Sequence, residues 1–78
     1  MYYFIVNPSS GDGKGVEVWN NTKKYLNSRN IDYEVYFTTG QGDARNKAKE
    51  LTESYQGPLY LVVIGGDGTI NEVVDGAV

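Results

Sequence analysis

Two glycine-rich segments hold most of the side chains that could do chemistry in this chain. The first runs from Asn7 to Gly15, and the second is Gly65-Gly66-Asp67-Gly68-Thr69. Glycines let backbone N–H groups approach a phosphate closely, and N–H groups at the start of a helix bind anions well. Asp67 could cap that helix, accept a bond from a ligand hydroxyl, or hold a Mg²⁺ that bridges phosphates. The pattern indicates phosphate binding, and a tight strand-to-helix turn capped by Asp67 is the simpler alternative.

Several other chemistries are excluded by residue type or spacing. Gly13-Lys14 is followed by Gly15 rather than by serine or threonine, which excludes a Walker-type loop. Gly11 and Gly13 are followed by Val16 where a dinucleotide fingerprint needs a third glycine. The chain has no histidine and no cysteine, which excludes histidine-based triads, zinc–histidine sites and disulfides.

Length and charge narrow the class of protein further. Seventy-eight residues make one small domain with a thin core. Seven basic and ten acidic residues give a net charge of −3, which argues against binding nucleic acid. The apolar run Leu59–Ile64 is far shorter than the roughly 20 residues of a transmembrane helix. The N-terminus has no basic region of the kind that opens a signal peptide, so a cytoplasmic location is expected.

The hydrophobic pattern predicts strands and helices in alternation. Apolar runs predict buried strands at Tyr2–Val6 and Leu59–Ile64, the latter in the centre of a sheet. Alternating residues from Ile31 to Thr38 predict a strand with one partly wet face. Helices are expected over Val16–Ser28, from Asp43 to the Gly57-Pro58 break, and through Thr69 towards the C-terminus.

The ends and faces of the last two helices can also be predicted. Asp43 is a good N-cap, and Ala44, Ala48, Leu51 and Tyr55 have helical spacing. Thr69 and Glu72 have the spacing of a capping box. The apolar stripe of the last helix is expected to consist of Ile70, Val73, Val74 and Ala77.

These elements predict a three-layer α/β fold of the βαβαβα type. Long crossovers keep the strands parallel, and the half-wet second strand belongs at an edge, which favours the order 2-1-3. The winding direction then reverses between strands 1 and 3, and open α/β sheets bind ligands at such switch points. Both glycine-rich segments follow these strands, so we expect them to line one crevice.

Three motifs resemble the diacylglycerol kinase catalytic domain family, which includes diacylglycerol, sphingosine and ceramide kinases and their bacterial relatives. They are Asn7-Pro8-Ser9-Ser10-Gly11, Gly42-Asp43-Ala44, and the long segment from Gly65 to Val74. All three occur in family order, so the resemblance covers essentially the whole chain. It implies that residues 1–78 are the N-terminal portion of the ATP-binding domain of a two-domain kinase. The remainder of that domain and a C-terminal domain would then follow Val78.

The resemblance implies transfer of the γ-phosphoryl of ATP to a hydroxyl of diacylglycerol or a related lipid, with Mg²⁺. Asp67 would help to hold the phosphate-bound Mg²⁺, and the choice between Thr38 and Thr39 as a nucleotide contact stays open. The catalytic base belongs to the second domain, so this chain alone is expected to be inactive. The positions that resemble the family's ATP site are Asn7, Pro8, Ser9, Ser10, Gly11, Thr38, Gly65, Gly66, Asp67, Gly68, Thr69, Asn71 and Glu72.

Two other functions share part of this pattern. NAD kinases also have a Gly-Gly-Asp-Gly-Thr loop, although Asn71-Glu72-Val73 and Asn7-Pro8 favour the lipid kinases. A non-catalytic α/β nucleotide-binding module is the alternative from a different class. The resemblance also implies contact with lipid at a membrane surface. Since a net charge of −3 opposes attraction to anionic lipid, the docking surface of this peripheral protein is expected outside residues 1–78.

Overall fold

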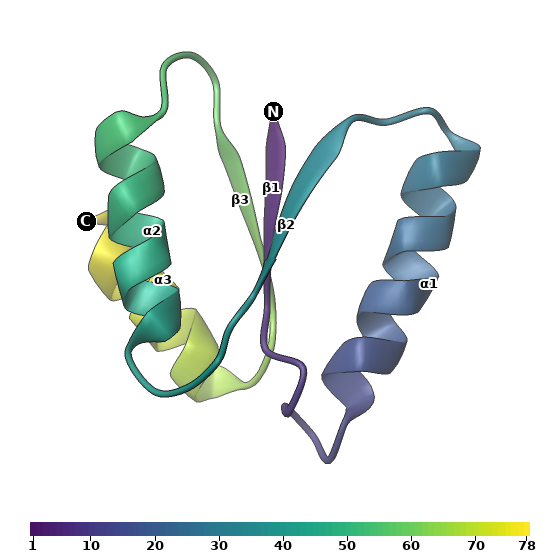
Figure 1. The fold of residues 1–78 in the computed structure, drawn as a ribbon, viewed down its shortest axis with the longest axis horizontal. Helices are drawn as coiled ribbons and strands as arrows, with labels where there is room; N and C mark the ends of the chain where they lie inside the picture. The colour runs from purple at the N-terminus through teal and green to yellow at the C-terminus, as the bar shows by residue number, and fades with distance from the viewer.

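Three parallel strands, each followed by a helix, make up the computed structural model, which describes residues 1–78 (Figure 1). The strands are β1 (Tyr2–Val6), β2 (Tyr33–Phe37) and β3 (Tyr60–Ile64). The helices are α1 (Lys14–Ser28), α2 (Asp43–Ser54) and α3 (Asp67–Ala77). The sheet order is β2-β1-β3, which confirms the predicted α/β fold and strand order.

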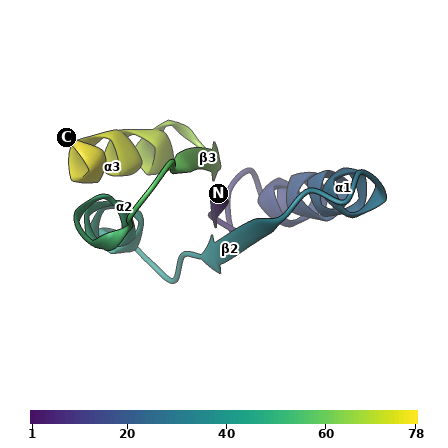
Figure 2. The ribbon, with the colours of Figure 1, turned by 90° about the horizontal axis from the view of Figure 1, so that it is seen from above.

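The helices cover both faces of the sheet. Figure 2 shows α1 on one face and α2 with α3 on the other. Because successive strand residues point to opposite faces, β1 supplies both cores. Ile5 packs against Ala44, Ala48, Leu51 and Val73 on the α2–α3 face. Phe4 and Val6 pack against Trp19 and Leu26 of α1 on the other, so the two-sided burial expected for β1 is confirmed.

The third strand does not lie in the centre of the sheet, as its apolar sequence had predicted. β3 pairs with β1 alone, in a register that places Val62 opposite Phe4. Its residues from Leu61 to Ile64 are half-buried, and Tyr60 is 55% exposed. The order β2-β1-β3 leaves one strand neighbour for β3, which explains its partial burial.

The predicted apolar stripe of α3 is wrong at three of its four positions. Ile70, Val74 and Ala77 are exposed, and the residues that the helix buries are Thr69, Val73 and Gly76. At Gly76, α3 lies too close to α2 for a larger side chain. A Cβ at position 76 would overlap the backbone carbonyl oxygen of Arg45 in α2.

No helix in the structure combines the length and the apolar character needed to cross a membrane.

Candidate functional site

The three strands end at the same edge of the sheet, and the loops that follow them gather there (Figure 1). The backbone N–H of Asn7 donates to the Ile64 carbonyl at 2.8 Å, and that of Thr38 donates to the Val6 carbonyl at 2.8 Å. These bonds fix the first residues of two loops relative to the neighbouring strands. The crevice predicted at the switch point therefore begins directly at the ends of the paired strands.

A cleft of about 240 Å³ opens between these loops. It brings together five residues of the predicted site: Asn7, Ser9, Thr38, Thr69 and Glu72. Thr39, Gly40, Gln41 and Ala44 complete its lining. Hydroxyl and amide groups dominate this surface, and such groups can donate hydrogen bonds to an oxygen-rich ligand.

The first and third motifs are joined directly across the cleft. The Asn7 side-chain amide donates to the Thr69 hydroxyl at 3.1 Å, over a separation of 62 residues. The backbone N–H of Ser9 donates to the Asn7 Oδ1 at 3.1 Å, which orients that amide. Thr69 is buried and accepts this bond, so its own proton can go to another acceptor.

The glycines of the third motif serve different purposes. A Cβ at position 65 would lie 2.8 Å from the Thr69 Cβ, so Gly65 is required by packing. A Cβ at position 66 would meet only the Ser10 hydroxyl, at 3.6 Å, and one at position 68 would meet nothing within 4 Å. Packing therefore does not require glycine at 66 or 68, and both leave the start of α3 open to a ligand.

The start of α3 has no side-chain cap. Gly66 occupies the N-cap position, and no side chain forms a capping hydrogen bond with the helix. Asp67 is the first helical residue and is exposed, so the alternative in which Asp67 is a plain N-cap is wrong. The first N–H groups of the helix and its dipole thus remain available to an anion.

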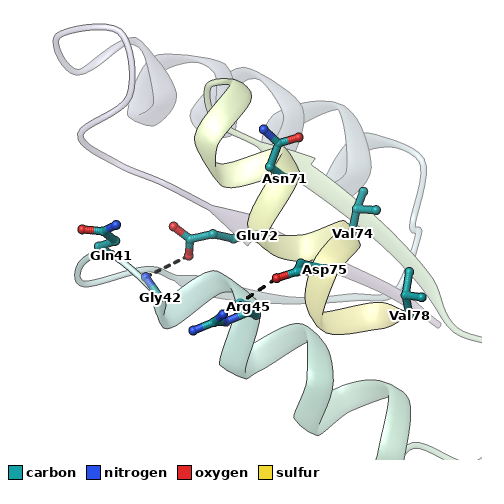
Figure 3. Close-up of a pocket in the computed structure, with 8 residues that line it drawn as sticks. All are labelled: Gln41, Gly42, Arg45, Asn71, Glu72, Val74, Asp75 and Val78. Atoms are coloured by element: carbon teal, nitrogen blue, oxygen red, sulfur yellow. Dashed lines mark hydrogen bonds and ion pairs between the residues drawn. The ribbon is translucent and has the colours of Figure 1, made fainter.

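The other predicted site residues lie around the cleft rather than in it. Ser10, Gly11 and Gly65 line a neighbouring cavity of about 270 Å³ beside α1. Asn71 lines a cavity of about 530 Å³ between α2 and α3, which Glu72 also borders (Figure 3). Four predicted residues line none of these cavities, namely Pro8, Gly66, Asp67 and Gly68.

Glu72 does not form the predicted capping box with Thr69. Its Oε1 instead accepts a hydrogen bond from the backbone N–H of Gly42 at 3.0 Å (Figure 3). Because α3 begins at Asp67, Thr69 lies inside the helix and cannot be its N-cap. Gly42 is the N-cap of α2 and has no side chain of its own to satisfy that helix. Glu72 therefore joins the start of α2 to α3.

Replacing Glu72 by alanine is expected to loosen the start of α2. A hydrogen bond to a charged group contributes about 1.5–3 kcal/mol, so amide exchange at Gly42 should accelerate by about tenfold or more. Glu72→Gln keeps an acceptor oxygen and should show a smaller increase. Hydrogen exchange measured by NMR tests both variants. Unchanged exchange at Gly42 in Glu72→Ala would contradict this assignment.

Asp43 has a role that the sequence did not predict. Gly42, not Asp43, is the N-cap of α2, because Asp43 already has helical geometry. The Asp43 carboxylate accepts bonds from the Thr39 backbone N–H at 2.8 Å and the Thr39 hydroxyl at 3.1 Å. It also accepts the Tyr36 hydroxyl at 2.9 Å. These bonds hold the pKa of Asp43 below its usual value, and the bond from the Thr39 N–H has the largest effect. The hydrogen bond to Asp43 in turn raises the pKa of Tyr36.

Known proteins resemble this chain over nearly its whole length. The "Putative lipid kinase YtlR" of Bacillus subtilis is 37% identical over 76 residues, which cover 96% of this chain and 25% of that protein. "Sphingosine kinase 1" of Caenorhabditis elegans is 37% identical over 74 residues (92% and 15%). "Diacylglycerol kinase" of Staphylococcus carnosus is 36% identical over 73 residues (92% and 23%). The chain thus spans a quarter or less of the length of these relatives.

The comparison with protein families gives the same result. The family model of the diacylglycerol kinase catalytic domain matches residues 1–78. This match includes all three motifs and the loops that surround the cleft. The chain belongs to the diacylglycerol kinase catalytic domain family.

Proposed function

We propose that residues 1–78 hold the phosphates of ATP in a kinase that phosphorylates a lipid hydroxyl. The observation that carries this proposal is the uncapped start of α3, where Gly66 and Gly68 leave the backbone uncovered. Phosphoryl transfer asks the protein mainly to position the phosphates and to neutralise their charge. Backbone N–H donors at a helix N-terminus meet both needs.

Each loop contributes polar groups to this proposed site. The N–H groups of Gly68 and Thr69 are placed to orient phosphate oxygens at the start of the helix. The hydroxyls of Ser10 and Thr69 can donate hydrogen bonds to the same oxygens. Thr38 faces the cleft from the opposite loop, which supports Thr38 as a nucleotide contact, although Thr39 also lines the cleft.

Asp67 fits the part of a Mg²⁺ ligand in this proposal. Its carboxylate is exposed at the start of α3 and is not used as a cap. No group of three or more acidic, histidine or cysteine side chains forms a metal cage in the structure. Mg²⁺ is commonly bound by one or two carboxylates together with water and substrate phosphates, which suits a single aspartate. The bound ion would neutralise the negative charge on the phosphates.

The names of the relatives support a lipid acceptor. They include a lipid kinase, a sphingosine kinase and a diacylglycerol kinase. The proposal therefore covers diacylglycerol and related lipids as a class. A kinase that acts on such acceptors must meet the membrane surface, so we expect the complete protein to be cytoplasmic and peripheral to the membrane.

The complete protein is expected to transfer label from γ-labelled ATP to lipid in the presence of Mg²⁺. The assay mixes total lipid extract with NAD and then separates organic from aqueous products. Label in the organic phase, lost when EDTA removes Mg²⁺, is the expected result.

Two other outcomes would contradict this proposal. Label on NAD would keep the phosphate site and assign the protein to NAD phosphorylation instead. Absence of label from both phases, together with amide resonances that ATP does not shift at Gly66, Gly68 and Thr69, would refute nucleotide binding altogether.

A further inference from the structure

The loop between β2 and α2 forms one wall of the cleft. Thr38, Thr39, Gly40 and Gln41 all line it. Of these residues, Thr38 is tied to the sheet through its N–H bond to Val6. Thr39 and Gly40 are exposed, so packing does little to fix their conformation. One backbone bond, from the Asp43 N–H to the Gly40 carbonyl at 3.3 Å, helps to shape this wall, and side-chain hydrogen bonds supply the rest.

Asp43 makes most of these bonds. One oxygen, Oδ2, accepts both donors of Thr39, the backbone N–H at 2.8 Å and the hydroxyl at 3.1 Å. These bonds fix the orientation of the peptide unit that joins Thr38 to Thr39. The acceptor is charged, which makes each bond stronger than a bond between neutral groups.

The Asp43 carboxylate is itself held in place by the sheet. The Tyr36 hydroxyl of β2 donates to Oδ1 at 2.9 Å and lies 3.0 Å from Oδ2. Lys47 lies 4.9 Å from the centre of the Tyr36 ring, and its side chain is only 18% exposed. The carboxylate is therefore anchored to β2 through Tyr36 and to α2 through its own backbone. Its bonds to Thr39 therefore hold the loop in a fixed position relative to β2 and α2.

We propose that Asp43 is a positioning residue of the nucleotide site, which orders the loop from Thr38 to Gly42 through its bonds to Thr39. This inference rests on the proposed function, because it assigns Thr38 to the nucleotide. Asp43 itself does not line the cleft. It acts on the ligand through the loop that it holds.

The test compares Asp43→Ala, Asp43→Asn and Asp32→Ala in the complete protein. Asp32 is an exposed aspartate before β2, at the opposite end of the sheet, and serves as a matched control for lost charge. Asp43→Ala should raise the KM for ATP by about tenfold or more and change kcat far less. The variant disorders the wall of the cleft and leaves the groups that react unchanged. Asp43→Asn keeps an acceptor oxygen and should recover much of the affinity. Asp32→Ala should behave as the wild type.

Hydrogen exchange over residues 38–42, with and without Mg²⁺–ATP, provides a second readout. Asp43→Ala should exchange about tenfold faster there than the wild type. An unchanged KM together with unchanged exchange would overturn the inference. If Asp43→Ala does not fold, Tyr36→Phe, which removes only the anchor of the carboxylate, should give a smaller increase in both quantities. Wild-type values for both in Tyr36→Phe would also overturn it.

Failure of the proposed function would look different. A wild type without turnover, and without protection of residues 38–42 by ATP, would refute the kinase assignment. Faster exchange in Asp43→Ala would then still support the ordering of the loop by Asp43. Equal exchange in the two proteins would refute that ordering whether or not the protein is a kinase.

Discussion

Gly66→Asp is expected to abolish ATP-dependent phosphorylation by the complete protein. The new carboxylate would stand at the N-cap of α3, beside the hydroxyl of Ser10. It would fill the space left by the missing Cβ and would repel the phosphates of ATP. Two like charges about 4 Å apart near a protein surface repel by roughly 4 kcal/mol, which corresponds to about a thousandfold loss of rate. Steady-state kinetics with saturating lipid measures this loss directly.

Two further variants at the same position separate charge from volume. The backbone at Gly66 has φ of −86°, which every residue type can adopt, and a Cβ there makes only an ordinary contact. Gly66→Ala and Gly66→Asn should therefore fold normally. Asparagine matches aspartate in size without its charge, so Gly66→Asn should keep more activity than Gly66→Asp. Normal turnover in Gly66→Asp would refute the placement of phosphate at the start of α3.

Gly76→Ala is expected to destabilise the packing of α3 against α2 severely. The added methyl group would overlap the carbonyl oxygen of Arg45 and would lie 3.2 Å from the Ala48 Cβ. Since the first of these is a backbone atom, one of the two helices must move away. Overpacking of this kind costs about 1–3 kcal/mol, a large share of the stability of a small domain. Hydrogen exchange of the α2 and α3 amides should report a loss of this size.

Gly68→Ala is the matched control within the same helix. A Cβ at position 68 meets nothing within 4 Å, and alanine favours a helix over glycine by about 0.5–1 kcal/mol. Amide protection in α3 should therefore stay the same or rise slightly. Equal losses in Gly68→Ala and Gly76→Ala would show that close packing does not explain the glycine at position 76.

The strand order and the loops of the site could be predicted because they depend on strong local signals. The alternation of β2 indicates that it buries one face, which places it at an edge of the sheet. The apolar runs of β1 and β3 look alike, and the predicted order 2-1-3 is the one in which β1 lies in the middle, as the structure shows. The glycine-rich segments follow strands that end at one edge of the sheet. Their convergence then follows from the parallel arrangement, whatever the details of side-chain packing.

The partners of the carboxylates could not be predicted in the same way. Asp43 and Glu72 were both expected to cap their own helices, since their spacing suits that role. In the structure the Asp43 carboxylate accepts a hydrogen bond from Thr39, which precedes it in the sequence. The Glu72 carboxylate accepts one from Gly42, which is 30 residues away. Several donors lie within reach of a carboxylate near a helix start, and only the tertiary fold decides among them. Sequence spacing carries no information about that choice.

The face of α3 could not be predicted for a related reason. Hydrophobic patterns recognise a helix face by its large apolar residues, but α3 also packs against α2 at a residue without a side chain. Gly76 has no hydrophobic signal, although its backbone lies against that of Arg45. Ile70 and Val74 carry a strong signal and are exposed.

The hydrogen bond between Asn7 and Thr69 also constrains when the cleft can form during synthesis of the chain. The central strand β1 leaves the ribosome before its neighbour β3, which is synthesised more than fifty residues later. Since synthesis adds about 5–20 residues per second, one edge of β1 stays unpaired for several seconds until β3 is available. Contacts at such long sequence separation slow folding, because a large loop must close before they form. The cleft can therefore form only after Thr69 has been synthesised, because two of the residues that line it lie 62 positions apart in the sequence.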